Sequence, residues 1–144
     1  MKKLNKKKII SLTKIINPFL MVDNVKNIVS LKSATGIKKV SKNAWFFKCH
    51  FTDQPMMPGT LIQESILQTI IATLYSSKKF KERICLITSS NTKFYSKVDK
   101  PTILNIKIKI LKITKLKIEA SAVVVDYKSV KIASGNYKYF ISIK

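Results

Sequence analysis

The sequence predicts an α+β fold in which a curved antiparallel sheet wraps around one long central helix. Residues 61–75 are apolar over much of a helical circumference, so this helix has to be surrounded by other structure. Extended segments, several with alternating apolar and polar residues, precede and follow it, as in antiparallel sheets with one solvated face. A chain of 144 residues with 46% apolar residues has the size of one domain.

The elements before the helix are short. Residues 1–16 are expected to be a basic leader whose Ile-rich part, 9–16, forms a short helix, and residues 17–144 a single domain. Strand-like patterning from 19 to 33 is followed by an expected turn near Thr35 and Gly36, and by extended segments at 37–41 and 44–51. The stretch from Pro55 to Gly59 then breaks the extended chain, and the helix begins.

At least four strands are expected after the helix. Their ranges are 84–94, 102–113, 116–126 and 130–142, with a short turn near 126–129 joining the last two. The sheet of one such domain covers the helix on one side only. We therefore expect its edges to pair with a second copy, for which a homodimer is the smallest closed arrangement.

The charge is strongly positive, with 28 Lys and Arg against 7 Asp and Glu, a formal net charge of +21. Such an excess invites a polyanion as partner. Arg83 is the only arginine, however, and base recognition favours the guanidinium group. Lysines also alternate with isoleucines over 106–110, as on a strand with one solvated face. We interpret the excess mainly as solvated surface that suits an acidic protein partner, without specific nucleic-acid binding.

The cysteines and the chain start favour a cytoplasmic protein with reduced thiols. Cys49 and Cys85 show no disulfide framework, and one histidine is too few for a recognisable four-ligand zinc site. The basic start is not followed by an uninterrupted apolar stretch with a small-residue cleavage site. Apolar runs fall short of the roughly 20 residues of a membrane span, so none is expected.

The segment from His50 to Glu64 combines three groups that could do chemistry together. Each has a purely structural explanation: a lone histidine is more often structural than catalytic, Pro-Gly starts helices, and a carboxylate complements a helix N-terminus. Together, His50 could take a carbon-bound proton near neutral pH, and Glu64 could hold a proton for a departing hydroxyl if burial raises its pKa. The N–H of Gly59, at the helix start, could polarise a carbonyl oxygen.

These residues resemble the active-site motif of the beta-hydroxyacyl-acyl-carrier-protein dehydratases, a hotdog-fold family with the pattern H-F-P-G-x-P-x-M-P-G-x-L-x-x-E-A-x-x-Q. The matching residues here are His50, Phe51, Pro55, Met57, Pro58, Gly59, Leu61, Glu64 and Gln68. Residues 18–23, Pro-Phe-Leu-Met-Val-Asp, and the pair Lys93-Phe94 are also similar to family segments. Cys49 departs from the glycine that usually precedes the histidine, and 52–54 and 99–101 depart from family loop and turn patterns.

The resemblance implies removal of water from a 3-hydroxyacyl thioester on acyl carrier protein, giving the trans-2-enoyl product without metal or organic cofactor. His50 would be the base and Glu64 would protonate or orient the leaving hydroxyl. Gly59 would polarise the thioester carbonyl, Met57 would contact substrate, and Gln68 would hold the carboxyl group. The two catalytic residues would come from opposite subunits of a homodimer or of a trimer of dimers. Glu64 favours plain dehydration, because a related isomerising branch has Asp there.

Two other functions are compatible with the sequence. A hotdog acyl-thioesterase could use the helix N-terminus and one carboxylate, and it would not require His50. A non-catalytic module that binds acyl groups or a polyanion could retain the motif for structural reasons.

Overall fold

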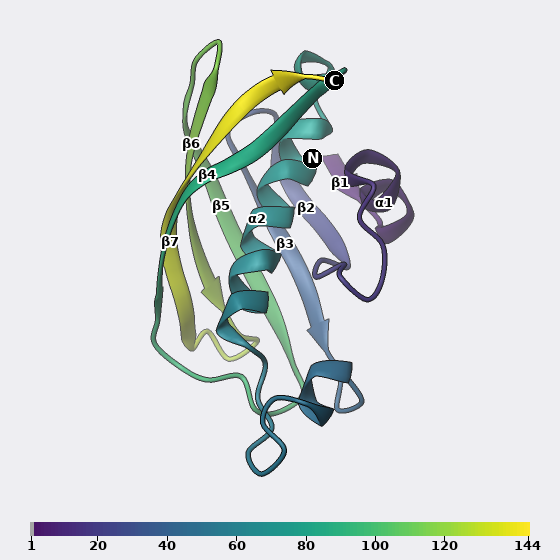
Figure 1. Ribbon diagram of the computed structural model, residues 1–144, viewed down its shortest axis with the longest axis vertical. Helices are drawn as coiled ribbons and strands as arrows, with labels where there is room; N and C mark the ends of the chain where they lie inside the picture. The colour runs from purple at the N-terminus through teal and green to yellow at the C-terminus, as the bar shows by residue number, and fades with distance from the viewer. Residues whose placement is uncertain (1) are drawn as a thin grey trace.

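The computed structural model describes residues 2–144, and it contains seven strands, two α-helices and two short 3-10 helices (Figure 1). In chain order these are β1 (Lys2–Leu4), α1 (Lys6–Thr13), β2 (Asn24–Val29), β3 (Ser33–Val40), η1 (Trp45–Lys48), α2 (Gly59–Tyr75), η2 (Lys78–Phe80), β4 (Arg83–Phe94), β5 (Thr102–Ile113), β6 (Lys117–Val125) and β7 (Lys131–Ile143).

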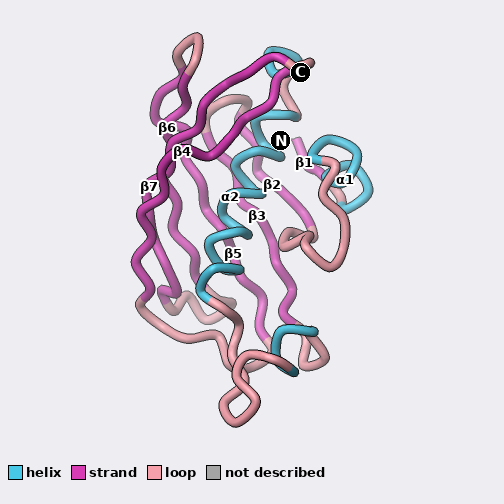
Figure 2. The backbone as a smooth tube through the Cα atoms, viewed as in Figure 1, coloured by secondary structure: helices cyan, strands magenta, loops and turns pink. Residues whose placement is uncertain are grey.

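All seven strands belong to one antiparallel sheet in the order β1-β2-β3-β5-β6-β7-β4. The sheet curves around α2, which lies along its inner face with β4 on one side and α1 on the other (Figures 1 and 2). The predicted arrangement of a curved antiparallel sheet around one long helix is confirmed. The three strands from β5 to β7 lie within one residue of their expected bounds, and Ile106 and Ile108 face the core while Lys107 and Lys109 face solvent.

The central helix is buried against the sheet along one side. Its core-facing apolar residues are Ile62, Ile66, Ile70 and Leu74, each at most 2% exposed. Thr69 and Thr73 are fully buried as well, and each hydroxyl donates to a carbonyl one turn earlier, at 2.7 and 2.8 Å. These buried hydroxyls are therefore hydrogen-bonded within the helix and leave its contact with the sheet undisturbed.

Gly36 corrects one expectation, because it lies within β3 and not in a turn. A side chain at this position would collide with the Thr69 side chain on α2. The glycine thus permits close approach of the helix to the sheet, and the turn falls earlier, at residues 30–32.

Other expected bounds before the helix are also wrong. The extended segment expected at 44–51 is instead the 3-10 helix η1 followed by a loop, and the strand expected over 19–33 is limited to β2. Residues 2–13, within the expected basic leader, pair with β2 through β1 and bury Leu4 and Ile9 in the core. The expected turn at 126–129 is present, where the Asp126 carboxylate accepts two backbone N–H bonds.

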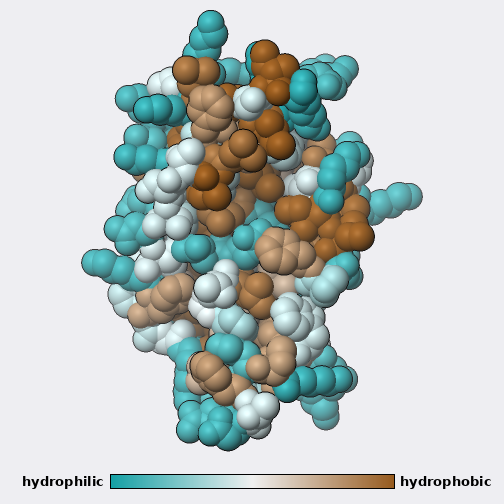
Figure 3. Space-filling model, viewed as in Figure 1, coloured by the Kyte–Doolittle hydropathy of each residue, from teal (hydrophilic) through white to brown (hydrophobic). Residues whose placement is uncertain are grey.

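One edge of the sheet is long and exposes several apolar side chains. Strand β4 pairs only with β7, and most of its side chains are exposed, including Leu86, Ile87 and Phe94. Figure 3 shows apolar surface gathered over the upper part of the face on which α2 lies. Over residues 2–144, no helix is long and apolar enough to cross a membrane.

Candidate active site

The loop before α2 holds His50 in one tautomer. Its Nδ1 lies 3.0 Å from the carbonyl oxygen of Met56, and because a carbonyl can only accept, Nδ1 carries the proton. Nε2 is then left with a lone pair, as a base requires. The backbone of Met56 returns a bond to the carbonyl of His50 at 2.7 Å, which closes the loop. Cys49, in place of the family glycine, has φ −131°, a conformation that any residue adopts.

Gly59 and Met57 line a hollow of about 320 Å³ at the start of α2. Met57 is buried, and its N–H bonds to the carbonyl of Val98 at 2.8 Å. A Cβ at Gly59 would lie 3.1 Å from the Phe94 ring, so the glycine lets this ring close against the helix start. As the first residue of α2, Gly59 has an N–H outside the helical bonding pattern, available to an oxygen atom in the hollow. The complete lining is Met56, Met57, Gly59, Ile62, Phe94, Tyr95, Ser96 and Lys97.

Glu64 is half-buried on α2, and Gln68, one turn later, holds its carboxyl group. The Gln68 side-chain amide donates to Glu64 Oε1 at 3.0 Å and to the carbonyl of Phe19 at 2.8 Å, and it accepts from the N–H of Met21 at 2.7 Å. Burial raises the pKa of Glu64, and the hydrogen bond from Gln68 only partly opposes this. The pKa of this carboxyl group is thereby shifted in the direction that a general acid requires.

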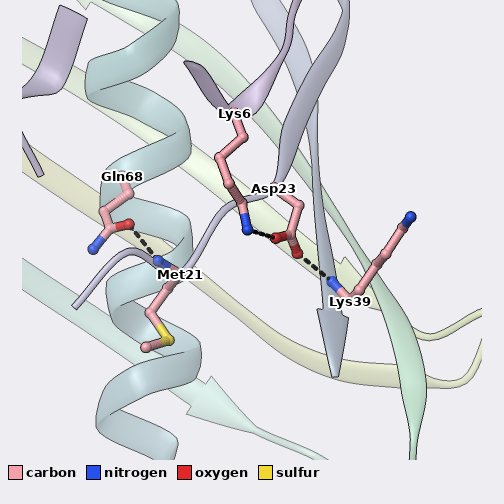
Figure 4. A network of polar contacts seen from close by, with 5 residues as sticks. All are labelled: Lys6, Met21, Asp23, Lys39 and Gln68. Atoms are coloured by element: carbon pink, nitrogen blue, oxygen red, sulfur yellow. Dashed lines mark hydrogen bonds and ion pairs between the residues drawn. The ribbon is translucent and has the colours of Figure 1, made fainter. Parts of the chain in front are cut away.

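The segment that meets Gln68 is itself fastened to the sheet (Figure 4). Asp23, two residues after Met21, pairs with Lys6 at 2.9 Å and accepts the Lys39 N–H at 2.7 Å. Burial opposes ionisation of Asp23, but these two bonds and the nearby Lys38 outweigh it, so its pKa lies below the usual value. Residues 18–23, which are similar to a family segment, therefore hold the Gln68 side chain in place, and Gln68 in turn holds the Glu64 carboxyl group.

Four of the predicted site residues form two pairs within one chain, and His50 belongs to neither pair. Gly59 and Met57 share the hollow, while Glu64 and Gln68 share a hydrogen bond. Within residues 2–144, no hydrogen bond joins His50 to Glu64, and the two are held by different partners. No three His, Cys, Asp or Glu side chains in this range gather where they could hold a metal ion.

Sequence reasoning missed the side chains that β4 places against α2. Phe94 covers Gly59, and Thr92 donates to the side chain of Gln63 at 2.6 Å. These pairs join residues about 30 positions apart, and no local pattern indicates them. The only indication in the sequence is the similarity of Lys93-Phe94 to a family segment, and it does not reveal which residues these side chains contact.

Residues 16–134 match the family model of the FabA-like domain, which is most of the chain. The chain belongs to the FabA-like family. Relatives of this FabA-like chain include two proteins named 3-hydroxyacyl-[acyl-carrier-protein] dehydratase FabZ. The one from Clostridium botulinum (strain Loch Maree / Type A3) is 38% identical over 97 residues, 67% of each chain. The one from Moorella thermoacetica is 36% identical over 97 residues, 67% of this chain and 68% of the relative.

Solved structures confirm the hotdog fold of this FabA-like chain. The dehydratase heterocomplex ApeI:P from Xenorhabdus doucetiae matches with a TM-score of 0.78 at 13% identity, over 94% of this chain and 91% of the other. The E. coli PaaI protein matches with a TM-score of 0.65 at 10% identity, over 81% and 80%.

Proposed function

We propose that this chain is a dehydratase that removes water from a 3-hydroxyacyl thioester carried on acyl carrier protein. The observation that carries the proposal is the half-buried Glu64 carboxyl group, held by Gln68 on the helix whose N-terminus carries Gly59. An acid and an oxyanion donor are thus supplied by one helix. The names of the Clostridium and Moorella relatives state the same reaction.

The reaction uses one base, one acid and one N–H donor. With the thioester carbonyl oxygen on the Gly59 N–H, Nε2 of His50 takes a proton from the carbon next to the carbonyl. The electron pair of that C–H bond forms the double bond, and the C–O bond at the third carbon breaks. Glu64 gives its proton to the departing oxygen, so water leaves and the trans-2-enoyl thioester remains. His50 loses its proton and Glu64 regains one before the next turnover.

A second copy of the chain belongs to this proposal. Because His50 and Glu64 of one chain have separate partners, we place the His50 of one subunit opposite the Glu64 of the other, as the family resemblance implies. The edge strand β4 supports a homodimer, since its outer edge has no neighbouring strand in the sheet and it exposes Leu86, Ile87 and Phe94, a surface suited to pairing. A trimer of such dimers is the larger assembly in this proposal.

The surface charge supports an acidic carrier. Within residues 2–144 there are three ion pairs, so most of the lysines have no carboxylate partner. Lys97 lines the hollow beside Gly59, and Nζ of Lys131 lies 4.3 Å from the ring centroid of Tyr95, another lining residue. Positive charge at the mouth of the site would speed the encounter with an acidic protein. The proposal places both proteins in the cytoplasm.

The test is hydration of a crotonyl thioester, the reverse reaction, by the purified protein. We expect His50→Ala and Glu64→Gln each to reduce the rate at least about a hundredfold, since each removes a proton-transfer group. Circular dichroism should show both variants folded. Activity that survives His50→Ala would reject the elimination mechanism. Release of free thiol from an acyl thioester would favour a thioesterase, and retention on DNA at physiological salt with neither activity would favour the non-catalytic module.

A further inference from the structure

One stripe of α2 is left open by the sheet, and two polar residues lie at its start. Successive residues are about 100° apart around a helix, so Glu64 lies opposite the buried Ile62 and Ile66, and Gln63 lies at the edge of the open side. Both are half-buried. Glu64 is turned toward the segment that contains Met21, through Gln68, whereas Gln63 is turned toward β4.

A chain of three hydrogen-bonding groups fixes the orientation of Gln63. The Tyr137 hydroxyl is fully buried and lies 2.8 Å from the Thr92 hydroxyl, and the Thr92 hydroxyl lies 2.6 Å from Oε1 of Gln63. Within residues 2–144 the Tyr137 hydroxyl has no other hydrogen-bond partner, so its proton is satisfied only by donation to Thr92. Thr92 must then donate its own proton to Gln63. Because each hydroxyl donates to the next group, from Tyr137 through Thr92 to Gln63, the side-chain amide oxygen of Gln63 is the atom that faces β4.

The side-chain NH2 of Gln63 is consequently left pointing away from Thr92, and among residues 2–144 it donates to no acceptor, so two donors are available to a ligand. Gly135 makes room for this arrangement, since a Cβ there would collide with the Tyr137 hydroxyl. The family pattern leaves the position of Gln63 open, between the Leu61 and Glu64 positions. The chain of hydrogen bonds is thus a feature of this sequence and its fold, beyond the motif itself.

We propose that Gln63 binds the 3-hydroxyl oxygen of the substrate and so makes the site prefer hydroxylated acyl chains. The inference rests on the proposed function. Gly59 and Gln63 are one helical turn apart on the same side of α2, so a substrate whose carbonyl oxygen meets Gly59 extends along the first turn toward Gln63 and Glu64. There Glu64 donates its proton to the oxygen that leaves. The Gln63 N–H contacts the same oxygen and stays on the amide, while Thr92 and Tyr137 are positioning residues.

The experiment compares two ligands that differ by one hydroxyl group. Binding of 3-hydroxybutyryl-coenzyme A and of butyryl-coenzyme A is measured by calorimetry in the His50→Ala background, where no turnover is expected. Gln63→Leu should weaken binding of the hydroxylated ligand by about three- to tenfold, the usual worth of one hydrogen bond, and leave butyryl-coenzyme A unchanged. Thr92→Val should act in the same direction, and Thr92→Ser should restore the preference. Thr88→Val, on the exposed part of β4, is the matched control and should change neither affinity.

If Gln63→Leu weakens the binding of both ligands equally, Gln63 has a merely structural role and the inference is overturned. The inference is also overturned if the variant keeps the wild-type preference for the hydroxylated ligand. These outcomes are separable from failure of the proposed function. If the wild-type protein does not hydrate the crotonyl thioester, the dehydratase proposal fails by itself. If it does and the preference survives Gln63→Leu, only the assignment of Gln63 fails.

Discussion

Glu64 is a carboxyl group held where its charge is costly. The same burial that suits it for proton donation has to be offset by the rest of the fold whenever the group ionises. Gln68 reduces this cost by one hydrogen bond while serving two backbone groups of the segment 19–21. Function and stability therefore oppose each other at this residue.

This opposition predicts a pH-dependent stability difference between the wild type and Glu64→Gln. The pKa of Glu64 is raised above its usual value of 4.5, so between pH 4.5 and the raised pKa the folded state binds more protons than the unfolded state. Stability of the wild type then falls as the pH rises from 4.5 through the raised pKa, and the neutral glutamine lacks this slope. Melting temperatures should therefore shift in favour of Glu64→Gln between pH 4 and pH 8. If the melting temperatures of the wild type and of Glu64→Gln differ by the same amount at pH 4 and at pH 8, the prediction is contradicted.

The candidate residues of the proposed site can be named from the sequence because they lie in one short segment. His50, Gly59 and Glu64 are within fifteen positions, and their chemistry is visible without a fold. Thr92 and Tyr137 could not be predicted to act on Gln63, because strand pairing across the sheet brings them together. These structural supports depend on contacts for which sequence spacing gives no indication.

At the scale of elements, the alternating strands β5, β6 and β7 were the most predictable, because period-two burial fixes both faces of a strand. The segment predicted to be extended at 44–51 instead contains the 3-10 helix η1, which buries Phe46. Gly36 was interpreted as a turn signal although it serves helix packing. Both errors have one cause, which is tertiary packing that overrides local preference.

The packing at Gly36 predicts the effect of one added methyl group. Gly36→Ala should destabilise the protein by about 1–3 kcal/mol, the usual cost of overpacking, because its Cβ would overlap the Thr69 side chain. Thr69→Ala removes the Oγ1 and Cγ2 atoms that collide. The double variant should accordingly be more stable than the sum of the two single changes predicts, as measured by urea unfolding. If the effects of the two changes on the free energy of unfolding are strictly additive, α2 moves away from β3 in Gly36→Ala and the clash with Thr69 does not form.

At the scale of the whole molecule, the single chain has two surfaces that suit a second copy. The open stripe of α2 carries Gln63 and Glu64, and the edge strand β4 exposes apolar side chains beside it. Exposed apolar area favours association in water, so the apolar side chains of β4 suit an interface between copies. In the proposed dimer a second copy covers both surfaces and brings its own His50 to Glu64. The homodimer that the sequence predicts from its apolar helix is the same arrangement and stays a prediction.

Mixing two inactive variants tests this shared site. If His50 of one subunit acts with Glu64 of the other, a dimer of one His50→Ala chain and one Glu64→Gln chain has one intact site and one that lacks both groups. After unfolding and refolding together in equal amounts, half of the dimers are mixed, so crotonyl-thioester hydration should recover to about a quarter of the wild-type rate. Each variant refolded alone serves as the control and should stay inactive. If His50 and Glu64 of the same chain form the site, every site in the mixture lacks one group, and no activity returns.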